Sequence, residues 1–127
     1  MTSRVIKEMA INEYKCNRPT RAKLLNALAY IIREAENPNN EKVFFTTVDI
    51  GHGKMKDGVI IQDINALCGM SWELGSDFNP EYMLNGMQAV TQDEDGYCMS
   101  VLTANDLYSA KINNLNELVY RIKQINR

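Results

Sequence analysis

The sequence predicts an α+β fold, a single domain over residues 1–127 in which helices pack on a small, mainly antiparallel sheet. Apolar residues recur at three- and four-residue steps over residues 21–36, the period of an amphipathic helix. Residues 42–50 are mostly β-branched or aromatic, the composition of a strand. A chain of 127 residues has room for one such domain.

The first third of the chain contains the best helix signal. Residues 3–15 fit a strand or a helix: Val5, Met9 and Ile11 can share one face of a strand. The helix, which is favoured, would be lined by Val5, Ile6, Met9 and Ala10. Pro19 disfavours helix at the residue before it, and Thr20 is expected to cap the helix at 21–36. That helix should end at the turn over residues 37–40, which holds a proline and three asparagines.

Residues 42–50 should form an interior strand, because apolar side chains occupy both of its faces, and the helix at 21–36 should cover one of them. The next segment has two interpretations. Residues 55–62 can form a strand paired with 42–50 through the glycine-rich turn. They can instead begin a helix that ends at Gly69, which is slightly favoured because Ile60, Ile64 and Leu67 would share a face.

The second half predicts more helix than strand. Residues 70–78 should be a loop with Trp72 partly buried, and Asn79, Pro80 and Glu81 mark the start of a helix near 80–87 that Gly86 weakens. A strand near 97–102 should pair with residues 88–92 through a turn at 93–96. A helix near 104–126 should follow a capping box at 103–106, with a break near residues 113–114.

Composition favours a cytoplasmic protein. Apolar residues make up 45% and charged residues 24% of the chain, as in ordinary globular proteins, and no apolar run approaches the ~20 residues that cross a bilayer. Residues 1–15 lack the pattern of a signal peptide. Cys16, Cys68 and Cys98 are too widely spaced for a disulfide framework or a zinc site, so we expect free, mostly buried thiols and no metal or other cofactor.

Charge is segregated along the chain. Residues 1–23 hold six Lys or Arg against two Asp or Glu, residues 24–110 hold four against thirteen, and residues 111–127 hold four against one. The middle is therefore acidic and both ends are basic. The net charge of −2 disfavours a nucleic-acid-binding protein, which is usually more basic.

Residues 51–58 are a candidate ligand site. A glycine-rich turn after a strand can hold a phosphate with its backbone N–H groups, and cations nearby would strengthen the binding. The residues that would form this site are His52, Lys54, Lys56, Arg18 and Arg21. The turn does not match the P-loop pattern, so the alternative is a connection between strands that lysines keep soluble. Arg18 and Arg21 can also form a solvated cluster paired with Glu8 or Glu13.

His52 is the natural candidate for acid–base catalysis, because it is the only histidine and its side chain titrates near neutral pH. Asp49 or Asp57 could orient its ring. No nucleophile, metal-ligand or catalytic motif accompanies it, however, and a solitary histidine in a loop is more often only exposed. A non-enzymatic protein is therefore the better interpretation, and we expect no metal site here.

The acidic middle is the candidate surface for a protein partner. Its expected contact residues are Glu73, Asp77, Asp93, Glu94, Asp95 and Trp72. Small size, charge segregation and the absence of a catalytic motif predict a protein-binding module, such as an inhibitor, immunity or host-modulating protein of a phage or other mobile element. The alternative is a small-ligand or nucleotide binder that uses the turn at 51–58 with Arg18 and Arg21. Apolar helix faces also allow a homo-oligomer.

Overall fold

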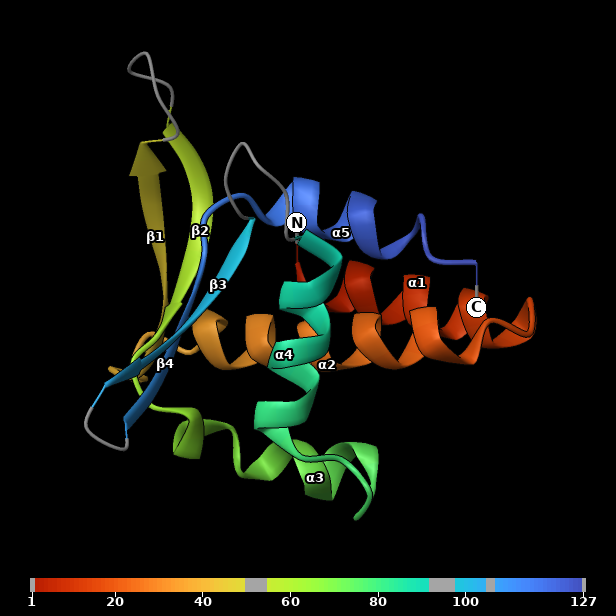
Figure 1. The fold of residues 1–127 in the computed structure, drawn as a ribbon, viewed down its shortest axis with the longest axis horizontal. Coiled ribbons are helices and arrows are strands. Elements are labelled where there is room, and N and C mark those ends of the chain that lie inside the picture. Colours follow the sequence, from red (N-terminus) through yellow and green to blue (C-terminus); the bar gives the residue numbers. More distant parts are fainter. Residues whose placement is uncertain (1, 50–54, 92–97, 105–106, 127) are drawn as a thin grey trace.

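The computed structural model describes residues 2–49, 55–91, 98–104 and 107–126, and within these ranges the chain has the predicted α+β fold (Figure 1). The elements in chain order are α1 (Ser3–Lys15), α2 (Pro19–Glu36), β1 (Val43–Asp49), β2 (Met55–Ile61), the 3-10 helix η1 (Ile64–Leu67), α3 (Gly69–Leu74), α4 (Pro80–Thr91), β3 (Met99–Ala104), β4 (Leu107–Ile112) and α5 (Leu115–Ile122).

The strands form one antiparallel sheet in the order β1-β2-β4-β3. Helices lie on one side of this sheet, and α2 runs away from it toward the far end of the molecule (Figure 1). Alternate strand residues face the helices, so Val59 and Ile61 of β2 and Ile112 of β4 are buried. Leu102 of β3 has the opposite parity and is 58% exposed.

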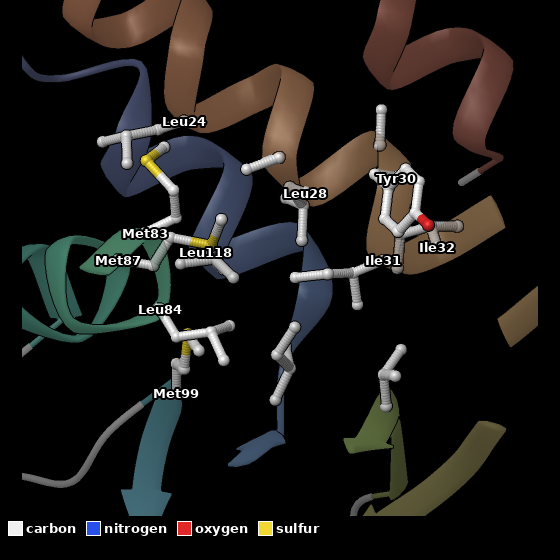
Figure 2. Packing of buried hydrophobic residues seen from close by; sticks show 14 of the residues in the cluster. Leu24, Leu28, Tyr30, Ile31, Ile32, Met83, Leu84, Met87, Met99 and Leu118 are labelled. Carbon is white, nitrogen blue, oxygen red and sulfur yellow. The ribbon is translucent and has the colours of Figure 1, made fainter. Parts of the chain in front are cut away.

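Helix α2 is the centre of the core. Its consecutive residues 27–32 are all buried, which requires neighbours on every side because each helical residue turns the side chain by about 100°. Figure 2 shows Leu28 and Ile31 of α2 facing side chains from other elements, among them Met87 of α4 and Leu118 of α5. Helix α1 packs along α2, and Ile6 and Ala10 supply its buried contacts.

Local hydrogen bonds fix both ends of α1, and a short turn joins it to α2. Thr2 caps α1, its hydroxyl accepting from the Val5 N–H, and the N–H of Cys16 closes the last turn on the carbonyl of Asn12. Asn17 then takes a positive φ of 59°, a conformation that asparagine tolerates better than most residues. The helical interpretation of residues 3–15 is thus confirmed. Thr20 does not cap α2, because Pro19 already occupies its first position.

Two expectations for the first half of the sheet are wrong. Strand β1 has the predicted position, but it lies at the edge of the sheet rather than inside it, and Phe45 is 44% exposed. Residues 55–61 form strand β2 instead of the favoured helix, in a hairpin whose register runs from Val43↔Ile61 to Asp49↔Met55. The run of β-branched residues at 59–61 favours a strand, and it outweighs the helix-like spacing that continues beyond it.

The expected helix near 104–126 is also wrong over its first half. Residues 107–112 form β4, which pairs with both β2 and β3, and only α5 is helical. Asn114 starts α5 as the sequence indicated, its Oδ1 accepting from the Glu117 N–H at 3.2 Å. Strand β3 does not pair with residues 88–92, because 88–91 complete α4. The turn at 93–96 lies outside the described residues.

Helix α4 begins as predicted and runs longer than predicted. The Asn79 side chain accepts from the Glu81 N–H at 2.9 Å, and the helix passes Gly86, which lies close to Leu24 of α2. The expected loop at 70–78 is partly helix α3, and Trp72 is not buried in it. The thiols were expected to be mostly buried, yet Cys16 and Cys68 are exposed and only Cys98 is buried.

A core substitution tests the central position of α2. Replacing Leu28, which is fully buried, by alanine should lower the free energy of unfolding by about 2–5 kcal/mol, because the methyl groups lose their contacts and leave a cavity. Urea denaturation measures the change. The matched control is Leu102→Ala on the open face of the sheet, expected within about 0.5 kcal/mol of the unsubstituted protein. Equal losses in both variants would contradict this packing.

Candidate functional site

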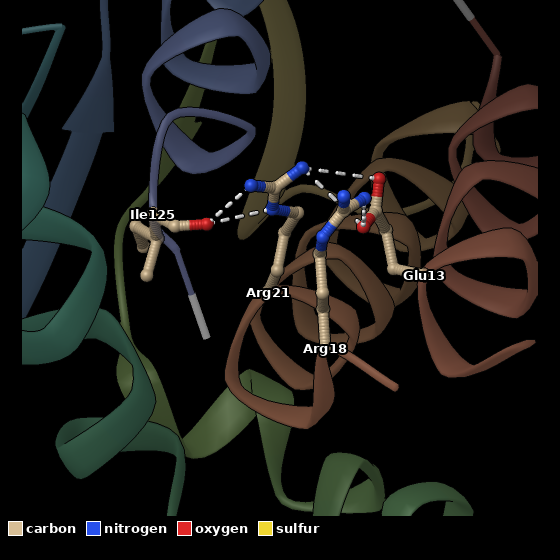
Figure 3. A network of polar contacts seen from close by, with 4 residues as sticks. All are labelled: Glu13, Arg18, Arg21 and Ile125. Atoms are coloured by element: carbon tan, nitrogen blue, oxygen red, sulfur yellow. Dashed lines mark hydrogen bonds and ion pairs between the residues drawn. The ribbon is translucent and has the colours of Figure 1, made fainter. Parts of the chain in front are cut away.

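Arg18 and Arg21, expected to bind a ligand, are engaged by the protein itself. The guanidinium groups of both converge on Glu13 of α1, with Arg18 Nη1 at 3.2 Å and Arg21 Nη1 at 3.4 Å from the carboxylate (Figure 3). Arg21 also donates from Nε and Nη2 to the carbonyl oxygen of Ile125, the first of these bonds at 2.8 Å. This network joins the end of α1, the start of α2 and the C-terminal segment.

The network engages both guanidinium groups that were expected to bind a ligand, although one positive charge remains because Glu13 supplies a single carboxylate. Glu13 and Arg21 are both buried, and either charge would be costly to bury without the other. Lys23 lies over the ring of Phe78, 5.9 Å from its centroid. Arg18 and Arg21 also lie at the end of α2 that points away from the sheet, whereas Lys56 belongs to β2 (Figure 1). His52 and Lys54 lie outside the described residues.

The acidic residues are arranged differently. Residues 63–81, here named the acidic segment, hold four carboxylates and no Lys or Arg, and they include η1, α3 and the first residues of α4. Two of the carboxylates are paired with cations from elsewhere: Asp63 with Lys42 at 3.3 Å and Glu73 with Arg33 at 3.0 Å. Within the described residues, Asp77 and Glu81 form no ion pair.

The acidic segment encloses a cleft of about 460 Å³. Its walls carry the carboxylates of Asp63 and Glu81 and the amides of Asn65 and Asn79, and Tyr108 of β4 lines it from outside the segment. Among the residues that the structure describes, no Lys or Arg lines it. A cleft with two carboxylates and several polar groups is suited to a cationic group such as a lysine or arginine side chain.

Asp63 is the best-defined carboxylate of this cleft. Its Oδ1 accepts from the backbone N–H of Asn65 at 2.9 Å, and its Oδ2 pairs with Lys42. The bond from Asn65 and the nearby ammonium of Lys42 hold the pKa of Asp63 below its usual value. Asp63 therefore stays ionised at neutral pH. It caps η1, and the ammonium of Lys42 partly offsets the negative charge that it brings to the cleft.

Trp72 projects from α3 into solvent. It is 90% exposed, although a tryptophan side chain is usually well buried. Its neighbour Ser71 lines the acidic cleft, and Tyr82 at the start of α4 is 78% exposed. The acidic segment thus presents the exposed ring of Trp72 together with its carboxylates, and Tyr82 adds a second exposed ring directly after it. Asp77 shares this segment, while residues 93–95 lie outside the described residues.

The sequence did not single out two of these residues. Asp63 and Glu81 line the cleft because η1 and α4 meet there, and neither helix boundary alone indicates that contact. The available signal was the complete absence of Lys and Arg from residues 57–110. In the described part of the chain, no group of three or more His, Cys, Asp or Glu side chains is placed to hold a metal ion.

No protein-family model, curated protein or solved structure matches this chain. None of the helices in the described ranges combines the length and the apolar character needed to cross a membrane.

The buried network predicts that Arg21 contributes more than Arg18 to the free energy of unfolding. Arg21→Ala should lower the free energy of unfolding by about 3 kcal/mol, because it leaves the Glu13 carboxylate and the Ile125 carbonyl short of partners. Arg18→Ala removes the same charge from a side chain that is 44% exposed and should cost less than about 1 kcal/mol. Thermal or urea unfolding compares them, and a larger loss in the Arg18 variant would contradict the geometry.

The lowered pKa of Asp63 predicts a pH effect. A carboxylate with a depressed folded-state pKa adds stability above its unfolded pKa of about 4, and this stability is lost as the pH falls through the folded value. Asp63→Asn keeps the capping oxygen and removes the charge. The variant should be less stable than the unsubstituted protein at neutral pH, and the difference should shrink toward about pH 3.

Urea titrations at both pH values measure this difference. Asp77→Asn is the matched control, since Asp77 is exposed and has no ion pair within the described residues. A difference for Asp63→Asn that stays constant with pH would exclude a contribution from its ionised form.

Proposed function

We propose that this chain is a non-enzymatic protein-binding module whose contact face is the acidic segment. The observation that carries the proposal is the exposure of Trp72 on a segment with four carboxylates and no cation. Tryptophan is enriched among the residues that dominate binding energy at protein interfaces. A partner that covers this side chain removes a large apolar area from water, which favours association.

The acidic cleft supports a basic partner. Asp63 and Glu81 lie on its wall, so a lysine or arginine side chain inserted from a partner would meet two carboxylates. Trp72 would then supply apolar contact beside a charge-paired cleft. Such an arrangement gives orientation and a high association rate through charge, while the buried aromatic contact supplies most of the affinity.

The size of the chain and its charge segregation are consistent with a small inhibitor, immunity or host-modulating protein of a phage or another mobile element. Proteins of this class act by covering a site on a larger partner rather than by chemistry of their own. We therefore propose a cytoplasmic partner with a basic surface that has room for an aromatic side chain.

The proposal predicts a strong effect at Trp72. The partner is first isolated by affinity capture from the native host and identified by mass spectrometry. With purified partner, Trp72→Ala should weaken binding by about tenfold or more, the loss expected for a dominant interface residue. Because Trp72 is the only tryptophan of the chain, its fluorescence should also shift to shorter wavelength on binding to a partner that lacks tryptophan.

Tyr120→Ala is the matched control. Tyr120 is also an exposed aromatic residue, but it belongs to α5, on the opposite side of α2 from α3 (Figure 1). Neutralising Asp77 and Glu81 together should lower the affinity mostly at low salt. If the tyrosine variant lost as much affinity as the tryptophan variant, the contact face would be elsewhere. Affinity and salt dependence that stay unchanged without the carboxylates at 73, 77, 93, 94 and 95 would rule out an acidic face.

A further inference from the structure

A second cavity, of about 210 Å³, lies between α1, α2 and α3 and is separate from the acidic cleft. The side chains that matter for its chemistry are Arg4, Lys7, Asn26, Tyr30, Arg33 and Glu73. Three of these are cations and one is a carboxylate. The cavity therefore has a positive lining in a protein whose net charge is −2.

The cations of this cavity are only weakly neutralised. Arg4 lies 3.7 Å from Glu8, and both side chains are largely exposed, so their attraction is screened by water. Lys7 forms no ion pair within the described residues. Arg33 is paired with Glu73 at the rim. The start of α1 adds the partial positive charge of its unpaired N–H groups.

Asn26 is a polar side chain without a structural partner. Its Oδ1 is buried and accepts no hydrogen bond from the described part of the chain, so its desolvation is not compensated there. The opposite assignment of the amide would present the NH₂ in place of the oxygen. A residue that costs stability and lines a cavity is expected where a ligand uses it.

The walls around Asn26 are held in place by packing. The guanidinium of Arg33 lies over the ring of Tyr30, 4.8 Å from its centroid. The Tyr30 hydroxyl reaches so close to Gly69 that a side chain at that position would collide with it. Burial raises the pKa of the Tyr30 hydroxyl, which therefore remains protonated. These contacts keep the cavity formed in the absence of a ligand, which lowers the ordering cost of binding.

We propose that this cavity binds a small organic anion, a carboxylate or a phosphate ester, held by Arg4, Lys7 and Arg33 and by the amide of Asn26. The volume restricts the ligand to molecules smaller than the occupants of typical drug-sized pockets. The anion pairs with Lys7 and adds to the existing pairing of Arg4 and Arg33. The amide accepts or donates one hydrogen bond according to the polar group beside the charge. The site is distinct from the acidic cleft, although Glu73 of the acidic segment lies on its wall.

Nuclear magnetic resonance of the ¹⁵N-labelled full chain tests this site. The probes are malate and glycerol 3-phosphate, each titrated at constant ionic strength with sodium chloride as the reference. We expect saturable shifts of the backbone amides of Lys7, Asn26 and Arg33 with at least one of the two probes. The probe that binds identifies the preferred anion. Absence of saturable shifts with both probes, up to millimolar concentration, would overturn the proposal.

Two lysines of α1 provide matched variants. Lys7→Gln should weaken binding of the probe by about threefold to fivefold, because it removes a cation from the cavity. Lys15→Gln makes the same charge change in the last turn of α1, outside the cavity, and should leave the affinity unchanged. An equal loss in both variants would mean that the anion responds only to overall charge, and would overturn the site.

Asn26→Leu separates a ligand-binding role from a structural one. The substitution replaces the amide by an apolar side chain of similar size. It should leave the unliganded protein as stable as before or more so, since an orphaned acceptor is removed, while binding of the probe falls by at least about threefold. A clear loss of stability without any loss of binding would show that Asn26 serves the fold alone.

Discussion

Residues 27–32 of helix α2 are all buried, and a helical stretch of this kind is stable only where other elements cover it on every side. That requirement explains the arrangement of the whole molecule. Helix α1 covers one side, α4 and α5 cover others, and the sheet closes the end where β1 packs against α2. Strand β1, which seemed from sequence to be the central element, is an edge strand that completes this cover.

The polar features follow from the same arrangement. Near the ends of α2, charged side chains take the place of apolar ones where other elements meet the helix. These side chains need ion-pair or hydrogen-bond partners. At the start of α2 the solution is the Glu13, Arg18 and Arg21 network, which also fastens the C-terminal segment through Ile125. Toward the middle of α2, Asn26 is left without a partner and the packing is incomplete, so a cavity remains there.

Local signals predicted the elements whose ends are fixed by their own side chains. Asn79 and Asn114 each accept a hydrogen bond from the N–H groups that begin a helix, and both helix starts were visible in the sequence. Strand β4 was missed, and the strand interpretation of β2 was ranked below a helix, because their apolar residues continue into α5 and η1 with helix-like spacing. The apolar spacing in these segments fits a strand and a helix alike. Pairing with other strands selects the strand, and the local sequence does not reveal the pairing partners.

The same reasoning applies to the candidate sites. The acidic character of the middle segment was visible from composition, whereas the cleft depends on contacts between η1, α4 and β4. Clustering of Arg18 and Arg21 in sequence suggested a free cationic site, but a single buried carboxylate at Glu13 uses both. The sequence shows which charged residues lie near one another along the chain, and only the fold shows which of them remain available to a ligand.

The order of strands in the sheet also determines the sequence in which the chain can acquire its structure. The α1–α2 pair and the β1–β2 hairpin join near neighbours, so they can form early. The contact between β2 and β4 joins Ile61 to Ala110 and must close a loop of nearly fifty residues, at an entropic cost of roughly 3 kcal/mol. Until that pairing occurs, β2 keeps an unpaired inner edge and α2 lacks part of its cover. The chain is therefore most exposed to misassociation before β4 joins the sheet and α5 packs on α2.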